Sequence, residues 1–172
     1  AAQREKVRCP GALGVFRYTL KESEEPNMMI STRGRYALRV MIDLAEHIDE
    51  GYIPLQTIAK RQGISEKYLE SILAVLSKAG LLDAVRGKGG GYRLSKPAKE
   101  YTAFEVLSLT EGTLAPVTCL ERGQQCENAV NCRTLPLWQG LDQVIAAYLC
   151  SYTLADLTRE EKPQPKHRRT KT

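Results

Sequence analysis

The sequence predicts a mainly α-helical protein with a small β-wing, that is, a winged helix-turn-helix followed by a long C-terminal dimerisation helix. Three patterns carry this prediction. Two short helical segments lie between residues 54 and 79, a glycine-rich turn between two short strands follows them, and an apolar stripe covers residues 137–152. A chain of 172 residues is long enough for one domain with an appended element.

The N-terminal part divides into an extension and a first helix. Residues 1–27 have mixed charge and no helical or strand period, and methionines stand at positions 28 and 29. We therefore expect 1–27 to be flexible or non-native. The first helix buries one face, because its apolar residues recur every three or four positions. These residues are Tyr36, Ala37, Val40, Met41, Leu44, Ala45 and Ile48.

A helix-turn-helix is predicted next. Pro54–Gln62 forms a short helix that Gly63 ends, and the Ser65 hydroxyl is placed to cap the helix that follows. The second helix has apolar residues on one face and polar residues on the other, so one face is buried. The buried residues are expected to be Leu69, Ile72, Leu73 and Leu76.

The polar face of this second helix has the size that a DNA major groove admits. Lys67 can neutralise a phosphate or donate to guanine, and Glu70 can accept a hydrogen bond from a cytosine amino group. A solvated helix face without any partner has the same composition, so this face alone does not show that the helix binds DNA. The expected DNA contacts of the helix are Ser65, Lys67, Tyr68, Glu70 and Ser71.

The wing consists of the strands Leu81–Val85 and Tyr92–Ser95 around a glycine-rich turn that holds Arg86 and Lys88. Glycines let the backbone approach a partner closely, and arginine prefers the electronegative minor groove of DNA. A plain hairpin turn is the alternative, but three consecutive glycines beside two cations exceed what a turn requires. Together with the net charge of +5, helix and wing favour nucleic-acid binding.

Three cysteines mark the irregular segment 112–134. Cys119, Cys126 and Cys132 have the spacing of chelating ligands, and thiolates bind zinc and iron–sulfur clusters. A tetrahedral site needs a fourth ligand, and neither histidine of the chain stands nearby. Free thiols or a vestigial loop are therefore the alternative. Candidates for the fourth ligand are Glu121, Glu127, Asp142 and a residue of a second subunit.

The C-terminal part is predicted to be a long apolar helix and a basic tail. The apolar stripe is wider than one small domain covers, so we expect it to pair with a second copy of the chain across a two-fold axis. The tail is rich in proline and basic residues and lacks apolar anchors, which predicts disorder. The residues expected in the dimer interface are Leu141, Val144, Tyr148 and Leu149.

These patterns divide the chain into the extension (1–27), the winged helix-turn-helix (28–98), a connecting helix with the cysteine loop (99–134), the dimerisation helix (135–157) and the tail (158–172). No apolar run approaches the about 20 residues needed to cross a membrane, and the N-terminus lacks an apolar signal region. We therefore expect a cytoplasmic protein. No nucleophile–base pair is suggested, so we do not expect an enzyme.

Four stretches together resemble one known family. The pattern extends from residue 28 to about residue 157 and is similar to the Rrf2 family of winged-helix transcription regulators, which includes iron–sulfur, nitric-oxide and cysteine-metabolism regulators. The resemblance implies a homodimer that binds an imperfect palindrome in double-stranded DNA, with Glu70 reading bases and Arg86 entering the minor groove. The four stretches are Ile30–Ala37, Gln62–Glu70, Gly80–Leu81 and Val85–Tyr92.

The three cysteines resemble the cluster loop of this family, but both fourth ligands known in the family are absent. Some members have a histidine three residues after the last cysteine, where this chain has Leu135. Others have an aspartate near the start of the first helix, where it has Arg35, which cannot bind a cationic metal. The resemblance therefore implies an iron–sulfur cluster as candidate cofactor and leaves its type open.

The reading that results is a DNA-binding transcription regulator, a repressor, that senses iron–sulfur, redox or nitric oxide status through its three-cysteine loop. One alternative keeps the DNA-binding role and replaces the cluster by thiol oxidation or a protein partner. An alternative from another class is a winged-helix module that binds protein. Salt-sensitive binding to duplex DNA argues against that second alternative.

Overall fold

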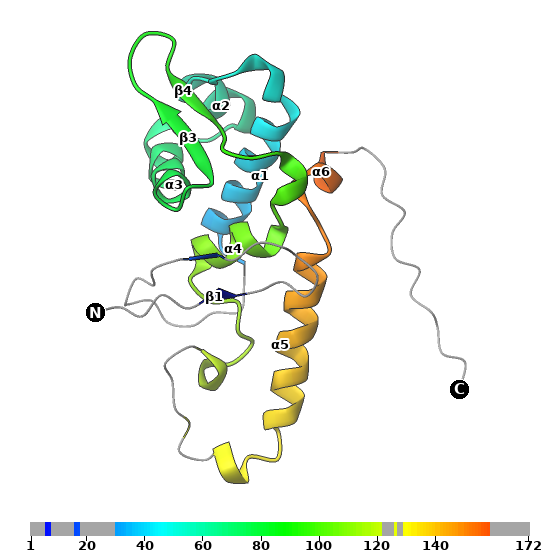
Figure 1. The fold of residues 1–172 in the computed structure, drawn as a ribbon. Coiled ribbons are helices and arrows are strands. Elements are labelled where there is room, and N and C mark those ends of the chain that lie inside the picture. Colours follow the sequence, from blue (N-terminus) through cyan, green and yellow to red (C-terminus); the bar gives the residue numbers. More distant parts are fainter. Residues whose placement is uncertain (1–5, 8–15, 18–29, 122–125, 127–128, 159–172) are drawn as a thin grey trace.

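A computed structural model of the chain describes residues 6–7, 16–17, 30–121, 126 and 129–158 (Figure 1). This part has a helical head that carries a β-hairpin, and a long helix that projects from the head. Of the N-terminal extension, one antiparallel pair is described, β1 (Lys6–Val7) with β2 (Phe16–Arg17). The rest of the extension, and the tail beyond Thr158, lie outside the described residues.

The head begins with α1 (Thr32–Glu46), which Ser31 caps by accepting the Gly34 N–H. The helix is shorter than its apolar stripe suggests. Ile48 falls in the 3₁₀ turn η1 (Ile48–Glu50) and is 52% exposed, so it does not belong to the buried face.

The predicted helix-turn-helix is confirmed. α2 (Leu55–Gln62) ends at Gly63, whose φ of +64° lies in the left-handed region that favours glycine. The next helix, α3 (Glu66–Lys78), begins after Ser65, whose hydroxyl accepts the Tyr68 N–H at 3.4 Å. The sequence places both helix ends correctly because cap residues act locally.

The predicted wing is also present, as the antiparallel strands β3 (Leu82–Val85) and β4 (Gly91–Leu94). Ile53 adds a further strand-like contact, because its N–H and its carbonyl both bond to Tyr92 at 3.0 and 2.9 Å. This contact requires glycine at position 91, since a Cβ there would meet the Ile53 carbonyl. The hairpin is thus anchored to the chain just before α2.

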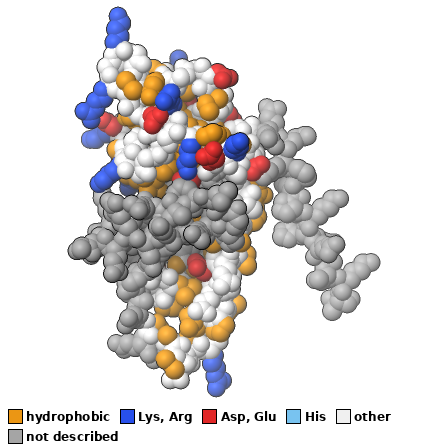
Figure 2. Space-filling view, viewed as in Figure 1, with side chains coloured by type: hydrophobic (Ala, Val, Ile, Leu, Met, Phe, Trp, Pro, Cys, Tyr) orange, Lys and Arg blue, Asp and Glu red, His pale blue; other side chains and the backbone are white. Residues whose placement is uncertain are grey.

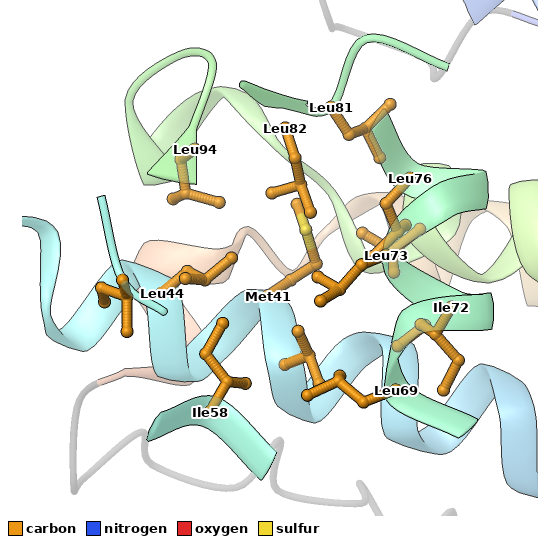
Figure 3. Packing of buried hydrophobic residues seen from close by; sticks show 14 of the residues in the cluster. Met41, Leu44, Ile58, Leu69, Ile72, Leu73, Leu76, Leu81, Leu82 and Leu94 are labelled. Carbon is orange, nitrogen blue, oxygen red and sulfur yellow. The ribbon is translucent and has the colours of Figure 1, made fainter. Parts of the chain in front are cut away.

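The hydrophobic core lies between α1, α2, α3 and the base of the wing (Figure 3). All four α3 residues predicted to be buried are buried. The core continues past the wing into α4 (Ala103–Glu111) and the short α6 (Leu154–Leu157), because Tyr101, Val106 and Leu154 are also fully buried. Residues on both sides of the wing therefore share one core.

The end of α4 holds the start of α1. Glu111 Oε1 accepts hydrogen bonds from the Ser31 N–H at 3.1 Å and from the Ser31 hydroxyl at 2.9 Å. A Cβ at Gly34 would collide with the same carboxylate, so any larger residue there would displace the Glu111 side chain from this position. Glu111 thereby contributes to the cap of the first helix from 80 residues away in sequence.

The C-terminal part differs in one respect from the predicted helix over 135–157. After α4 the chain passes through the 3₁₀ turns η3 (Thr118–Leu120) and η4 (Ala129–Asn131) and returns to the head along α5 (Leu135–Cys150) (Figure 1). A separate capping box, Thr153 with Asp156, then starts α6. Each described helix lacks the combination of length and apolar character that a membrane span requires.

A buried carboxylate joins the base of the wing to α4, beside the 3₁₀ turn η2 (Ala98–Glu100). The Glu105 side chain is 2% exposed, and its Oε1 accepts from Lys96 Nζ at 3.3 Å. The Lys96 ammonium also lies 4.6 Å from the centre of the Tyr101 ring. Burial raises the pKa of Glu105 from its usual 4.5 to about 7, against the opposing effect of Lys96.

The raised pKa of Glu105 predicts that the protein loses stability as pH rises. Between about pH 4.5 and 7 the unfolded chain releases this proton while the folded protein keeps it. The free energy of unfolding should fall by up to about 3 kcal/mol more than in Glu105→Gln, whose amide does not titrate. Urea unfolding of both proteins at about pH 5 and about pH 8 measures this difference. Parallel profiles would show that the folded protein holds Glu105 ionised.

Candidate nucleic-acid interface and cysteine loop

The outer face of α3 exposes the residues predicted to contact DNA. Tyr68 is half-buried, because its ring packs edge-on against Tyr36 of α1 with ring centres 6.0 Å apart. Lys67 and Glu70 stand about one turn apart and place a cation and a carboxylate on this face. The exposed members of the predicted set are Ser65, Lys67, Glu70 and Ser71.

The wing turn exposes both of its cations. Arg86 and Lys88 are exposed. The Gly90 N–H donates to the Gly87 carbonyl at 2.9 Å and closes the turn that contains Lys88 and directly follows Arg86. Figure 2 shows Lys and Arg side chains projecting from the head, and hydrophobic side chains along the lower part where α5 lies. The polar α3 face and the cationic wing turn are thus both exposed on the head.

Two arginines of α1, Arg33 and Arg39, contact the helix-turn-helix and were not predicted as part of this surface. Arg33 Nη2 donates to the Ser71 carbonyl of α3 at 3.4 Å. Arg39 donates to Gln62, the last residue of α2. Arg35 is exposed on the same helix and donates to Thr32 of α1 instead. The signal in the sequence was RGRYALR at positions 33–39, where the polar positions are all arginine.

Glu70 tests whether α3 reads bases. A carboxylate near a polyanion should reject wrong sequences more than it adds affinity, so Glu70→Ala should lower the preference for operator over unrelated DNA by about fivefold to tenfold. Non-specific binding should be equal or stronger. Titration of an operator selected from random duplexes, beside an unrelated duplex, measures both affinities. An equal loss on both duplexes would give Glu70 a structural role.

The three cysteines are half-buried, with Cys119 in η3 and Cys132 directly after η4. Among the residues that the structure describes, no three His, Cys, Asp or Glu side chains lie close enough to hold a metal ion. The structure thus does not bring the three sulfurs to one point. The donor chemistry nevertheless fits a soft metal or cluster, and Glu121 has a buried Oε1 without a hydrogen-bond partner, two residues after Cys119.

Local hydrogen bonds lower the pKa of the Cys132 thiol. Its Sγ lies 3.4 Å from the Thr134 hydroxyl, and hydrogen bonds from Thr134 and from the Leu135 N–H lower the pKa of Cys132. A thiolate is both a metal ligand and the form of cysteine that oxidises. Of the other candidate fourth ligands, Asp142 is half-buried on α5, where burial raises its pKa, and Glu127 lies outside the described residues.

The predicted dimer surface is uncovered in the single chain. No residue of α5 is buried, although the helix packs against α4. Val144 and Tyr148 are 64% and 54% exposed, and Leu141 and Leu149 are half-buried. Such a row of apolar side chains on a projecting helix is typical of a surface that another chain covers.

Comparison with known proteins identifies relatives. Residues 30–160 match the model of the Rrf2 family, described as an iron-dependent transcriptional regulator. The HTH-type transcriptional regulator IscR of Photobacterium profundum is 38% identical over 137 residues, which cover 80% of this chain and 79% of that protein.

Two solved structures are also similar. The structure of CymR (YrzC), the global cysteine regulator of B. subtilis, has 38% identity and a TM-score of 0.63, over 76% of this chain and 95% of that one. The structure of T. potens IscR has 37% identity and a TM-score of 0.59, over 75% and 85% of the two chains.

Proposed function

This chain belongs to the Rrf2 family of DNA-binding transcription regulators, and from that premise we propose that it is a cytoplasmic, homodimeric repressor that senses iron–sulfur status through its cysteine loop. The observation that carries the proposal is the joint exposure of the polar α3 face and the Arg86–Lys88 wing on the head, on a chain that also holds three thiols in one segment. The binding surface and the sensor candidate thus share one small protein.

For DNA binding, α3 enters the major groove and the wing follows the adjacent minor groove. Lys67 neutralises a phosphate or donates to guanine, Glu70 accepts from cytosine, and Arg86 gains from the focused negative potential of the minor groove. Two copies related by a two-fold axis present two α3 helices, which requires half-sites about 34 Å apart, one turn of DNA. A palindromic operator follows from that symmetry.

For sensing, Cys119, Cys126 and Cys132 are the residues that would hold an iron–sulfur cluster. The unpartnered Oε1 of Glu121 makes this carboxylate the favoured fourth ligand within the described chain. Such a cluster supplies a group whose loss or oxidation changes the charge and order of the loop. The thiolate-favouring surroundings of Cys132 prepare that sulfur for ligation.

A second candidate function keeps the DNA-binding role and senses by thiol oxidation or through a protein partner. The observation that favours oxidation is the lowered pKa of Cys132, which raises its thiolate fraction near neutral pH. The similarity to CymR, a cysteine regulator, is compatible with this candidate as well.

Anaerobic reconstitution with ferrous iron and sulfide separates the two candidates. The first requires a visible chromophore with bound iron and sulfide, which Cys119→Ser, Cys126→Ser and Cys132→Ser each remove. Thr118→Ala, an exposed neighbour of Cys119, is the matched control and should keep the colour. Glu121→Ala should leave a cluster that oxygen destroys faster. Protein that stays colourless, yet binds DNA only in one thiol oxidation state, would establish the second candidate.

A further inference from the structure

Arg39 of α1 holds the turn of the helix-turn-helix. Its Nη2 donates to the Gln62 carbonyl at 2.9 Å, and its Nε donates to the Gln62 side-chain Oε1 at 3.1 Å. Gln62 is the last residue of α2 and directly precedes Gly63, where the chain turns toward α3. Two parallel bonds from one planar guanidinium fix the orientation as well as the distance of that turn.

The side chain of Gln62 is held from its other end by a buried carboxylate. Gln62 Nε2 donates to Asp43 Oδ1 at 2.9 Å, and Arg61 Nη1 lies 3.5 Å from Asp43 Oδ2. Asp43 is 3% exposed, and a carboxylate at that depth is tolerated only when it is paired. The amide of Gln62 therefore has one orientation, with its nitrogen toward Asp43 and its oxygen toward Arg39.

Arg39 also supports α3 through a pair of aromatic rings. Its guanidinium lies 5.2 Å from the centre of the Tyr36 ring, and Tyr36 packs against Tyr68 in the first turn of α3. Arg39 thus acts on the entry to α3 at two points, the turn before it and the aromatic residue inside it.

We infer that Arg39 is a positioning residue, which sets the angle of α3 in the DNA groove and makes no phosphate contact of its own. This inference rests on the proposed DNA-binding function and adds to it a determinant of sequence preference outside α3 and the wing. A tilt of α3 misplaces Lys67 and Glu70 relative to base edges while leaving non-specific attraction to phosphates in place.

Salt dependence of the DNA affinity can distinguish a positioning role of Arg39 from a direct phosphate contact. Losing a phosphate contact weakens binding to all duplexes and lowers the salt slope of the affinity by about one. Losing a positioning contact weakens operator binding and leaves the slope unchanged. Gln62→Ala removes the side-chain bond of this link without changing the charge and leaves the bond to the main-chain carbonyl in place. Arg35→Ala removes an equal charge from the same helix.

We expect Arg39→Ala and Gln62→Ala to reduce operator affinity about tenfold, and binding to an unrelated duplex by less than about twofold. The double variant should lose no more than about Arg39→Ala alone, because the bond that Gln62→Ala removes is one of the two that Arg39→Ala removes. Arg35→Ala should retain the operator preference. Thermal unfolding and sedimentation of each variant establish that the fold and assembly are intact.

A drop in the salt slope for Arg39→Ala, with Gln62→Ala binding as the wild type does, would overturn the inference and assign Arg39 to a phosphate. Additive losses in the double variant would also overturn it. Hydrogen exchange in the free protein gives a readout without DNA, since the amides of residues 63–68 should exchange faster in both variants than in Arg35→Ala. A wild-type protein without salt-sensitive duplex binding would instead refute the proposed function itself.

Discussion

Val144→Glu should convert the protein from a dimer into a monomer and weaken operator binding by at least about 100-fold. Val144 is 64% exposed on α5, so the folded single chain tolerates a glutamate there. In a two-fold interface the same change buries an unpaired carboxylate from each copy, which is strongly destabilising. A monomer engages one half-site at a time and loses the gain from simultaneous engagement of two.

Gln139→Glu is the matched control for this change. Gln139 is exposed on the same helix, away from the predicted interface residues, and accepts the same charge. This variant should remain dimeric in sedimentation velocity and bind operator like the wild type. Leu141→Glu is a less informative variant, because Leu141 is already half-buried within the single chain. A wild-type protein that sediments as a monomer at micromolar concentration would contradict the proposed dimer.

Arg86→Ala should reduce operator affinity by about tenfold to 100-fold, and clearly more than Lys88→Ala. Both residues are exposed on the same wing turn, so each substitution removes one positive charge from the same part of the surface. The guanidinium gains from the narrow, negative minor groove in addition to its charge, whereas the ammonium of Lys88 acts as a hydrated point charge. Binding titrations at two salt concentrations measure the difference. Equal, small losses would mean that the wing touches only phosphates.

The parts of the fold that local signals specify could be predicted from the sequence. The helix-turn-helix and the wing depend on cap residues and glycines within a few positions of each element boundary, such as Ser65 and Gly63. The buried face of α3 follows from helical periodicity, since Leu69, Ile72 and Leu73 repeat at that spacing and are buried.

Of the features that were missed, one had a local signal and the others depend on tertiary contacts. Apolar periodicity alone extended the last helix to residue 157, although α5 ends at Cys150 and the capping box of Thr153 and Asp156 starts α6, whose Leu154 is buried in the core. No local signal distinguishes Arg39 from an ordinary charged surface residue, because its partner Gln62 is 23 positions away. Likewise, the cysteine spacing indicates a kind of ligand but cannot place three sulfurs in space, because a spacing in sequence fixes relative side-chain positions only within one regular helix or strand.

The cap that Glu111 places on α1, together with the core residues Tyr101 and Leu154, bears on how this protein can be divided or recombined. A fragment that stops at the wing would lose the carboxylate that holds Ser31 and would expose the side of α1 that α4 and α6 cover. Exchanging everything after the wing between relatives would therefore also replace the residues of α4 and α6 that pack against α1 of the helix-turn-helix head. The workable unit of exchange is the whole head, with only the cysteine segment and the projecting portion of α5 left free to diverge.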